Sequence, residues 1–198
     1  MKRLNCPHCQ YPINACLCAS IRPLSTSVEL IVLQDPSEVK HAKNSVKLMK
    51  AVMKDLRVVV GETTEDFMSL RAYLDEQTKP IFVLYPSEVS LSVGELSPPK
   101  EAILLLLDGT WRKAFKLLKL NPWLNQYPAV HLDLDSPSHY TIRKAKRSDS
   151  LSTLEAAAMA ISIIEPSCDV SPLTDALSAL VDQRLMAMPL SVRQRYLS

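Results

Sequence analysis

Residues 102–111, AILLLLDGTW, decide the fold of this 198-residue chain. The run from Ala102 to Leu107 has no polar face, which predicts a strand over Ile103–Leu107 that is buried on both sides, as in the centre of a parallel sheet. The strand continues straight into Asp108-Gly109-Thr110 and a helix that we expect to reach about Leu120. A strand that leads directly into a helix is the repeating unit of α/β proteins.

The same alternation of strand and helix extends to both sides of this stretch. It predicts an α/β fold with a mostly parallel sheet and flanking helices. Further strands are expected at Val28–Leu33, Leu56–Val60, Ile81–Tyr85 and Ala129–Leu134, with loops to about Lys100 and over 135–150. Helices are expected from Asp35 to about Met53, from Thr63 with Phe67, Leu70 and Leu74 buried, from Ser152 to near Pro166, and in one or two C-terminal segments that bury Leu177, Leu180, Val181 and Leu185.

Two helix starts have specific capping signals. Asp35 is a good N-cap, Pro36 suits the first helical position, and Glu38 stands where its carboxylate can reach back to the cap. Ser152 and Glu155 form the pattern of a capping box.

The composition excludes several classes of protein. The chain has only three glycines and no glycine-rich phosphate loop of the Walker or dinucleotide-binding type. No apolar run approaches the roughly 18 residues needed to span a bilayer, and the stretch from Met1 to Cys6 has no apolar signal core behind its charges. We therefore expect a cytoplasmic protein that does not enter a membrane, in which thiols stay reduced.

Residues 1–24 predict a small metal-binding knuckle, and residues 25–198 a single larger domain. Cys6-x-x-Cys9 and Cys16-x-Cys18 place four thiolates within a short segment, enough for one tetrahedral zinc. Four cysteine ligands are typical of a closed, structural site, and so short a segment would depend on metal to fold. The alternative is four unrelated cysteines. His8 is interpreted as a bystander, and Cys168 as a small buried hydrophobe.

Three segments are expected to meet beyond the carboxyl ends of the strands, where open α/β sheets bind their ligands. They are Gln34–Glu38, Asp108–Trp111 and residues 136–153, and each leads toward a helix start, which suits a carboxylate or a phosphate. Asp108 at the end of the central strand is either a functional carboxylate or a helix cap, a role that Thr110 can share. Trp111 can stack on an adenine or simply pack.

Positive charge is clustered although the net charge is only +2. Of the 23 Lys and Arg, six fall in 40–57, four in 112–119 and four in 143–147. Arg112, Lys116 and Lys119 share one stripe of a helix, with Lys113 beside it, and Arg143, Lys144, Lys146 and Arg147 share a loop with His139 and Tyr140. Basic residues interleaved with aromatic ones suit RNA phosphates and an unstacked base. The alternatives are solvated helix faces and a mobile charged loop.

Taken together, these segments resemble those of the DTW-domain family of tRNA-uridine aminocarboxypropyltransferases. The matching pieces, in chain order, are Cys6-x-x-Cys9 with Cys16-x-Cys18, Pro36-Ser37-Glu38 with His41-x-Lys43-Asn44, Asp108-Gly109-Thr110-Trp111, Tyr140-x-Ile142-Arg143, and Leu151-Ser152-Thr153-Leu154-Glu155-Ala156. The family pattern often has a histidine before the first proline. This chain has Asp35 there, and we assign it no catalytic role.

The resemblance implies a fold related to SPOUT methyltransferases, with a knotted C-terminal half, and transfer of the aminocarboxypropyl group of S-adenosylmethionine to N3 of a uridine in tRNA. The released product would be 5′-methylthioadenosine, and in bacterial members the uridine is expected in the variable loop.

The resemblance also suggests roles for individual residues. Asp108 is expected to act as the base or to position the uridine, with Thr110 and Trp111 shaping the pocket. Ser152, Thr153, Leu107 and Gly109 would hold the donor, and Glu155 would either cap its helix or bind the donor's amine. The residues expected to contact RNA are Lys43, Arg112, Tyr140, Arg143, Lys144, Lys146 and Arg147.

Two rival functions stay open at this point, and a third interpretation, a scaffold protein with no ligand, fits the composition but leaves the residues at the strand ends unexplained. A SPOUT-type RNA methyltransferase would use the same donor but release S-adenosylhomocysteine. A zinc-containing tRNA-binding module would bind RNA without a donor pocket. The sequence leaves open whether the protein is a monomer or a homodimer.

Overall fold

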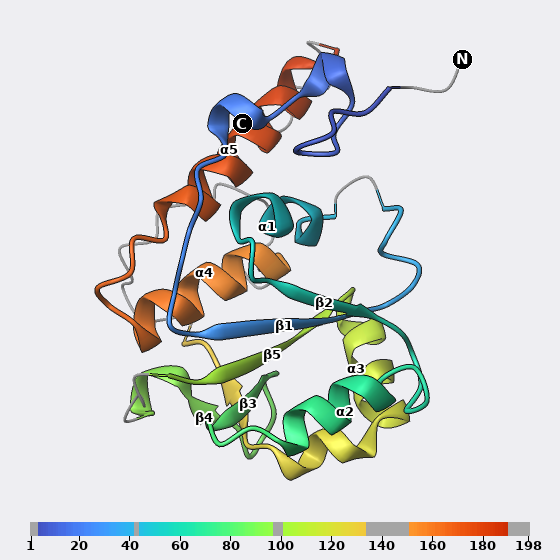
Figure 1. Ribbon diagram of the computed structural model, residues 1–198, viewed down its shortest axis with the longest axis vertical. Helices are drawn as coiled ribbons and strands as arrows, with labels where there is room; N and C mark the ends of the chain where they lie inside the picture. Colours follow the sequence, from blue (N-terminus) through green and yellow to red (C-terminus); the bar gives the residue numbers. More distant parts are fainter. Residues whose placement is uncertain (1–3, 42–43, 97–100, 134–150, 190–198) are drawn as a thin grey trace.

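The computed structural model describes residues 4–41, 44–96, 101–133 and 151–189, and it contains one six-stranded sheet (Figure 1). The strands are β1 (Glu29–Gln34), β2 (Arg57–Val60), β3 (Ile81–Leu84), β4 (Leu91–Ser92), β5 (Ile103–Asp108) and β6 (Ala129–His131), in the order β2-β1-β5-β3-β6-β4. All five pairings in this sheet are parallel. The predicted α/β class with a mostly parallel sheet is confirmed.

Strand β5 is the internal strand that the run of leucines predicted. It pairs with β1 on one side and with β3 on the other. Leu104 and Leu106 belong to the hydrophobic core on one face of the sheet, and Ile103 and Leu105 to the core on the other. A strand between two cores has no solvated face, which explains the absence of polar residues before Asp108.

Helices cover both faces of the sheet (Figure 1). Helices α1 (Val46–Val52), α4 (Thr153–Ile164) and α5 (Ser171–Met186) contribute to the first core. Helices α2 (Met68–Asp75) and α3 (Trp111–Leu120), with the 3-10 helix η4 (Pro122–Gln126), contribute to the second. Short 3-10 helices also occur at Ile13–Ala15, Cys18–Ser20 and Val93–Glu95. In the described residues, no helix is long and apolar enough to cross a membrane.

The prediction of a helix from Asp35 to Met53 is wrong over its first half. Residues 36–40 form turns, and α1 begins only at Val46. Asp35 Oδ1 accepts hydrogen bonds from the backbone N–H (2.9 Å) and the hydroxyl of Ser37, a turn that competes with a helix. The side chain of Glu38 is bonded to Lys113 instead of reaching back to the cap.

Two element boundaries and one short strand also differ from the sequence predictions. Helix α2 begins at Met68, later than the predicted Thr63, because Asp66 Oδ2 accepts the backbone N–H groups of Glu62 and Thr63 in a turn. Strand β6 ends at His131, and the two-residue strand β4 was not predicted.

The buried face of α5 is also rotated relative to the prediction. Leu173, Ala176 and Leu180 are buried, whereas Val181 is 46% exposed. The observed spacing of three and four residues is that of one helix face, and of the predicted set only Leu180 lies fully within it.

Candidate active site and metal centre

The carboxylate of Asp108 lies at the carboxyl end of the central strand and is held there by two side chains. Its Oδ2 accepts a hydrogen bond from Gln34 Nε2 at 2.7 Å, and its Oδ1 accepts one from Thr153 Oγ1 at 2.5 Å. Gln34 ends the neighbouring strand β1, and Thr153 begins α4. Three distant parts of the sequence therefore fix one carboxylate, which is only 7% exposed.

Burial raises the pKa of Asp108 above its ordinary value. The hydrogen bonds from Thr153 and Gln34 act in the opposite direction, and the negative charges of Glu38 and Asp35 add to the rise. A carboxylate with a raised pKa is a stronger proton acceptor once ionised, which is the property of a general base.

The alternative role of Asp108 as a helix cap is not what its contacts show. The N-cap residue of α3 is Thr110, and within the described part of the chain its side chain makes no capping hydrogen bond. The hydrogen bonds to the Asp108 carboxylate come from Gln34 of β1 and Thr153 of α4, and not from the start of α3.

Two further acids, Glu38 and Asp35, lie near Asp108, and the negative charge of each is stabilised by neighbouring groups. Glu38 accepts a hydrogen bond from Lys113 Nζ at 2.6 Å, and this bond raises the pKa of Lys113. Burial acts to raise the pKa of Asp35, but the hydrogen bonds from Ser37 and the charges of Lys113 and Lys116 outweigh it, so the pKa is lowered. Asp35 therefore stays ionised, and its hydrogen-bonding role in the turn at Ser37 is structural.

Gly109 is required by close packing between the strand end and α3. A Cβ atom at this position would lie 2.8 Å from Cβ of Lys113, closer than such atoms approach in proteins. Because the contact is with the base of the Lys113 side chain, relief would require a shift of α3 itself. The glycine thus lets the helix start directly beyond the strand.

A cavity of about 510 Å³ opens beside this strand end. Its volume is within the roughly 300–1,000 Å³ typical of small-molecule sites. The lining comes from the carboxyl ends of β3, β5 and β6 and from the starts of α3 and α4: Leu84, Tyr85, Pro86, Leu106, Leu107, Gly109, Thr110, Trp111, Ala114, His131, Leu132, Leu151, Thr153 and Ala156. The predicted residues Leu107, Gly109, Thr110, Trp111 and Thr153 are therefore brought together on one cavity wall.

The polar and apolar parts of the cavity suit different parts of a ligand. Leucine, alanine and aromatic side chains can enclose a purine, and the first residues of α3 and α4 lie in the wall. The unpaired N–H groups of a helix start attract a carboxylate or a phosphate. The cavity can thus take an adenosine group joined to an anionic one.

The predicted capping box at the start of α4 is confirmed. Ser152 Oγ accepts the N–H of Glu155 at 3.3 Å, and Glu155 Oε2 accepts the N–H of Ser152 at 2.7 Å. Neither residue is part of the cavity lining, whereas Thr153 between them is. The capping role of Glu155 is thus shown, and its proposed contact with a donor amine stays a prediction.

Replacing Ser152 by alanine should destabilise the protein by about 1 kcal/mol, the usual cost of losing a side-chain cap. Denaturant unfolding measures this change. Glu155→Gln is the matched control, because glutamine also completes a capping box and should unfold close to wild type. If Glu155 also binds the donor's amine, the same Glu155→Gln protein should bind the donor more weakly.

Among the lining residues that sequence reasoning missed, two carry polar groups, Tyr85 and His131. Tyr85 follows β3 and packs edge-on against Trp111, with ring centroids 6.1 Å apart. His131 ends β6, and its Nδ1 lies 2.9 Å from the hydroxyl of Ser90. Both stand at the carboxyl end of a parallel strand, so the rule that located Asp108 would have found them if applied to every strand.

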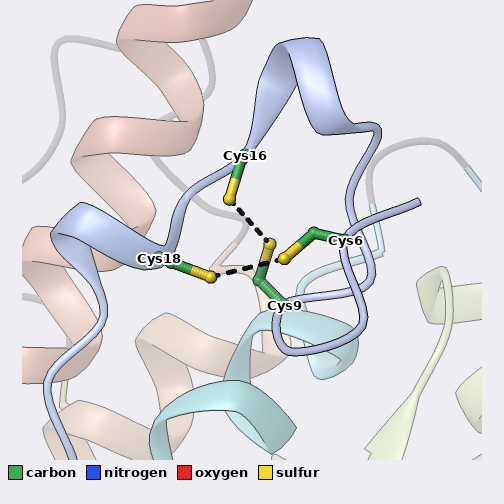
Figure 2. A group of neighbouring side chains, drawn as sticks. All are labelled: Cys6, Cys9, Cys16 and Cys18. Carbon is green, nitrogen blue, oxygen red and sulfur yellow. Dashed lines mark hydrogen bonds between the residues drawn. The ribbon is translucent and has the colours of Figure 1, made fainter. Parts of the chain in front are cut away.

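The four cysteines of the N-terminal segment form a compact cluster, in which the sulfur atoms point toward one another (Figure 2). The Sγ atoms of Cys6 and Cys18 are 3.5 Å apart, those of Cys9 and Cys16 are 3.7 Å apart, and all four lie within 4.8 Å of one another. Zinc–sulfur bonds of about 2.3 Å in a tetrahedron place the sulfurs about 3.8 Å apart. The described residues thus fit one tetrahedral metal ion.

The pKa values of two thiols in the cluster are shifted in opposite directions. The backbone N–H groups of Cys9 and His8 lower the pKa of Cys6 to about 6. Hydrogen bonding to Cys16 and Cys6 raises the pKa of Cys18 to about 12, because a second thiolate beside the first is electrostatically unfavourable. A bound cation would offset this repulsion, because it coordinates the thiolate form of cysteine. Cys168 lies apart from the cluster, and its Sγ is directed to the carbonyl of Ser25 at 3.6 Å.

The remaining predicted RNA contacts divide into two groups. Arg112 is exposed on the first turn of α3. Lys43, Tyr140, Arg143, Lys144, Lys146 and Arg147 lie outside the described residues, and so does His139.

The described residues thus combine a parallel α/β sheet, a cavity at its carboxyl edge and a four-cysteine cluster that could hold a metal ion. Comparison with known families is more specific: the DTW domain matches residues 3–185, and the chain belongs to the DTW domain family.

Curated relatives agree with this assignment. The chain is 30% identical over 171 residues to "tRNA-uridine aminocarboxypropyltransferase 2" of Mus musculus, an alignment that covers 83% of this chain and 57% of the mouse protein. It is 28% identical to the Drosophila melanogaster protein of the same name, with 83% and 68% covered, and 25% identical to "tRNA-uridine aminocarboxypropyltransferase A" of Arabidopsis thaliana, with 83% and 74% covered. The chain thus spans little more than half the length of the mouse relative.

Proposed function

We propose that this protein transfers the 3-amino-3-carboxypropyl group of S-adenosylmethionine to N3 of a uridine in tRNA, with release of 5′-methylthioadenosine. The observation that carries the proposal is the cavity beside Asp108, whose wall contains Gly109, Thr110 and Trp111 of the motif that the family shares. Relatives in mammals, insects and plants carry the name of this activity.

The donor's adenosine would lie against the apolar wall, and its carboxylate near the starts of α3 and α4. Its sulfonium supplies the activation, so this chain needs to orient the reacting carbon rather than to provide redox chemistry. Orientation of two reactants in one cavity is itself a large catalytic effect.

The uridine must lose the proton on N3, and Asp108 is the group we assign to accept it. The carboxylate is buried behind Thr153, a cavity-lining residue whose hydroxyl donates to Asp108 Oδ1. A proton that leaves a base in the cavity can therefore pass through this hydroxyl, which gives its own proton to Asp108. Gln34 keeps the carboxylate in place for this step.

The metal at the four cysteines is proposed to be zinc in a structural role. Four thiolates complete its usual coordination and leave no open position for catalysis. A site of this kind requires reduced thiols, which supports the cytoplasm as the compartment.

We further propose a SPOUT-like fold with a knotted C-terminal half. Family membership and the non-sequential order of parallel strands support this proposal. The tRNA would approach the carboxyl edge of the sheet. The basic residues at 143–147, which precede α4 in the sequence and lie outside the described residues, would supply contacts to its phosphates.

Chromatography of the nucleoside product tests this proposal against its two rivals. With S-adenosylmethionine and unmodified tRNA, 5′-methylthioadenosine should form in proportion to enzyme, and a reaction without tRNA corrects for spontaneous breakdown of the donor. S-adenosylhomocysteine in its place would make the protein a methyltransferase. Neither product, with tRNA still bound, would make it a binding module.

A further inference from the structure

Helix α3 presents two large aromatic side chains to solvent. Trp111 is 53% exposed and Phe115 is 52% exposed. Residues four apart lie on the same side of a helix, about 6 Å apart along its axis. The buried side of α3, with Ala114 and Leu117, faces the core, so the aromatic pair belongs to the outer surface. Neither ring is needed to fill the core.

Positive charge accompanies this aromatic pair. Lys119 Nζ lies 5.3 Å from the ring centroid of Phe115, and Arg112 is exposed beside Trp111. The other two cations of the helix are engaged by acids, Lys113 by Glu38 and Lys116 by Glu62. The charge that remains for a partner is therefore next to the aromatic rings.

The aromatic pair is also continuous with the cavity. Trp111 lines the cavity and packs edge-on against Tyr85 at its rim. Phe115 is one helical turn after Trp111 along α3 and follows the lining residue Ala114 in the sequence. An RNA strand that leaves the cavity along this helix would therefore meet the ring of Phe115 and then, one turn later, the cation of Lys119.

We propose that the outer face of α3, formed by Arg112, Trp111, Phe115 and Lys119, binds the single-stranded RNA next to the modified uridine. One flanking base stacks on Phe115, and the adjoining phosphates contact Lys119 and Arg112. Stacking of bases on aromatic side chains combined with phosphate contacts is the general mode of single-strand binding. This inference rests on the proposed function, and it adds a subsite outside the donor cavity.

The face is assigned to RNA rather than to a second copy of this chain because of its charge. Two copies of the same face would bring the cations of one copy toward the cations of the other, which is unfavourable. Polyanionic RNA neutralises both cations.

The test uses the whole 198-residue chain and compares Phe115→Ala with Phe115→Trp. We expect Phe115→Ala to weaken tRNA binding by about 5- to 150-fold, the range for loss of one stacked base, and to raise KM for tRNA with little change in donor affinity. Phe115→Trp should bind like wild type. Val181→Ala removes an exposed side chain from α5, on the other face of the sheet, and should leave both unchanged.

A salt series separates stacking from charge. Phe115→Ala should leave the slope of log affinity against log salt unchanged, whereas Lys119→Ala should reduce it by roughly 0.7 to 1. Unchanged tRNA affinity in Phe115→Ala would overturn the inference. The inference would also be overturned if sedimentation showed that the wild-type protein is a dimer and that Phe115→Ala is a monomer. The face would then be a contact between subunits. If wild type lacks transferase activity but Phe115→Ala still weakens tRNA binding, the proposed function fails and the RNA subsite stands.

Discussion

Asp108→Ala and Asp108→Asn should each lower the rate of aminocarboxypropyl transfer by about 10²- to 10⁴-fold, the usual contribution of a general base. Donor binding should be retained, because Asp108 lies behind the cavity wall rather than in it. Single-turnover rates at saturating donor and tRNA measure the effect. An unchanged rate in a folded variant would remove Asp108 from the mechanism.

Asp108→Asn also provides the control for folding. Burial raises the pKa of Asp108 in the folded protein above the ordinary 3.8, so the native state holds more protons than the unfolded state between these two values. The contribution of Asp108 to stability is therefore present below pH 3.8 and is lost as the pH rises through the raised pKa. The asparagine does not titrate, so its stability relative to wild type should improve over that interval. Denaturant unfolding at a series of pH values measures the difference.

The role of the intervening hydroxyl can be tested at Thr153. Thr153→Ser keeps the hydroxyl that donates to Asp108 and should stay within a few-fold of the wild-type rate. Thr153→Val keeps the shape and removes the hydroxyl. It should lower the transfer rate by most of the factor expected for Asp108→Ala. Equal rates for the two variants would mean that the proton takes another path.

Cys9→Ser should abolish metal binding and destabilise the protein by about 4 kcal/mol or more, as expected for loss of a structural metal. Cys9 is 1% exposed, and it belongs to the same buried cluster as residues of α1 and α5. Loss of the metal should therefore also destabilise the packing of α1 and α5 around the knuckle. Elemental analysis and denaturant unfolding measure the two effects.

Cys168→Ser is the matched control, since this thiol lies apart from the four-cysteine cluster. It should keep one metal ion per chain. Wild-type protein that is purified without metal, and whose stability does not respond to added zinc, would contradict a structural metal centre.

The parts of the fold that could be predicted are those with a strong local signal. The leucine run before Asp108 allows only a doubly buried strand, and Ser152 with Glu155 closes a capping box that needs no distant partner. The segment at Asp35 had an equally good local pattern and was mispredicted. There, Ser37 satisfies the Asp35 carboxylate in a turn, and Lys113, far away in sequence, takes the Glu38 carboxylate.

The candidate site was predictable in some of its residues but not in its connections. The four cysteines and Asp108 could be identified because their spacing and position are distinctive. The bonds from Gln34 and Thr153 to Asp108 depend on β1 and α4 lying beside β5, and the place of His131 in the wall depends on β6 lying near β3. Strand order is set by packing across the whole sheet, so no local pattern contains it. The boundary between residues 1–24 and the rest of the chain stays a prediction.

The central claim is aminocarboxypropyl transfer, and donor labelling tests it most directly. The protein is incubated with unmodified tRNA and S-adenosylmethionine labelled either in the methyl group or in the carboxyl carbon. We expect label in tRNA only from the carboxyl-labelled donor, and nuclease mapping should then place it on a uridine. Label in tRNA only from the methyl-labelled donor would contradict the account and make the protein a methyltransferase.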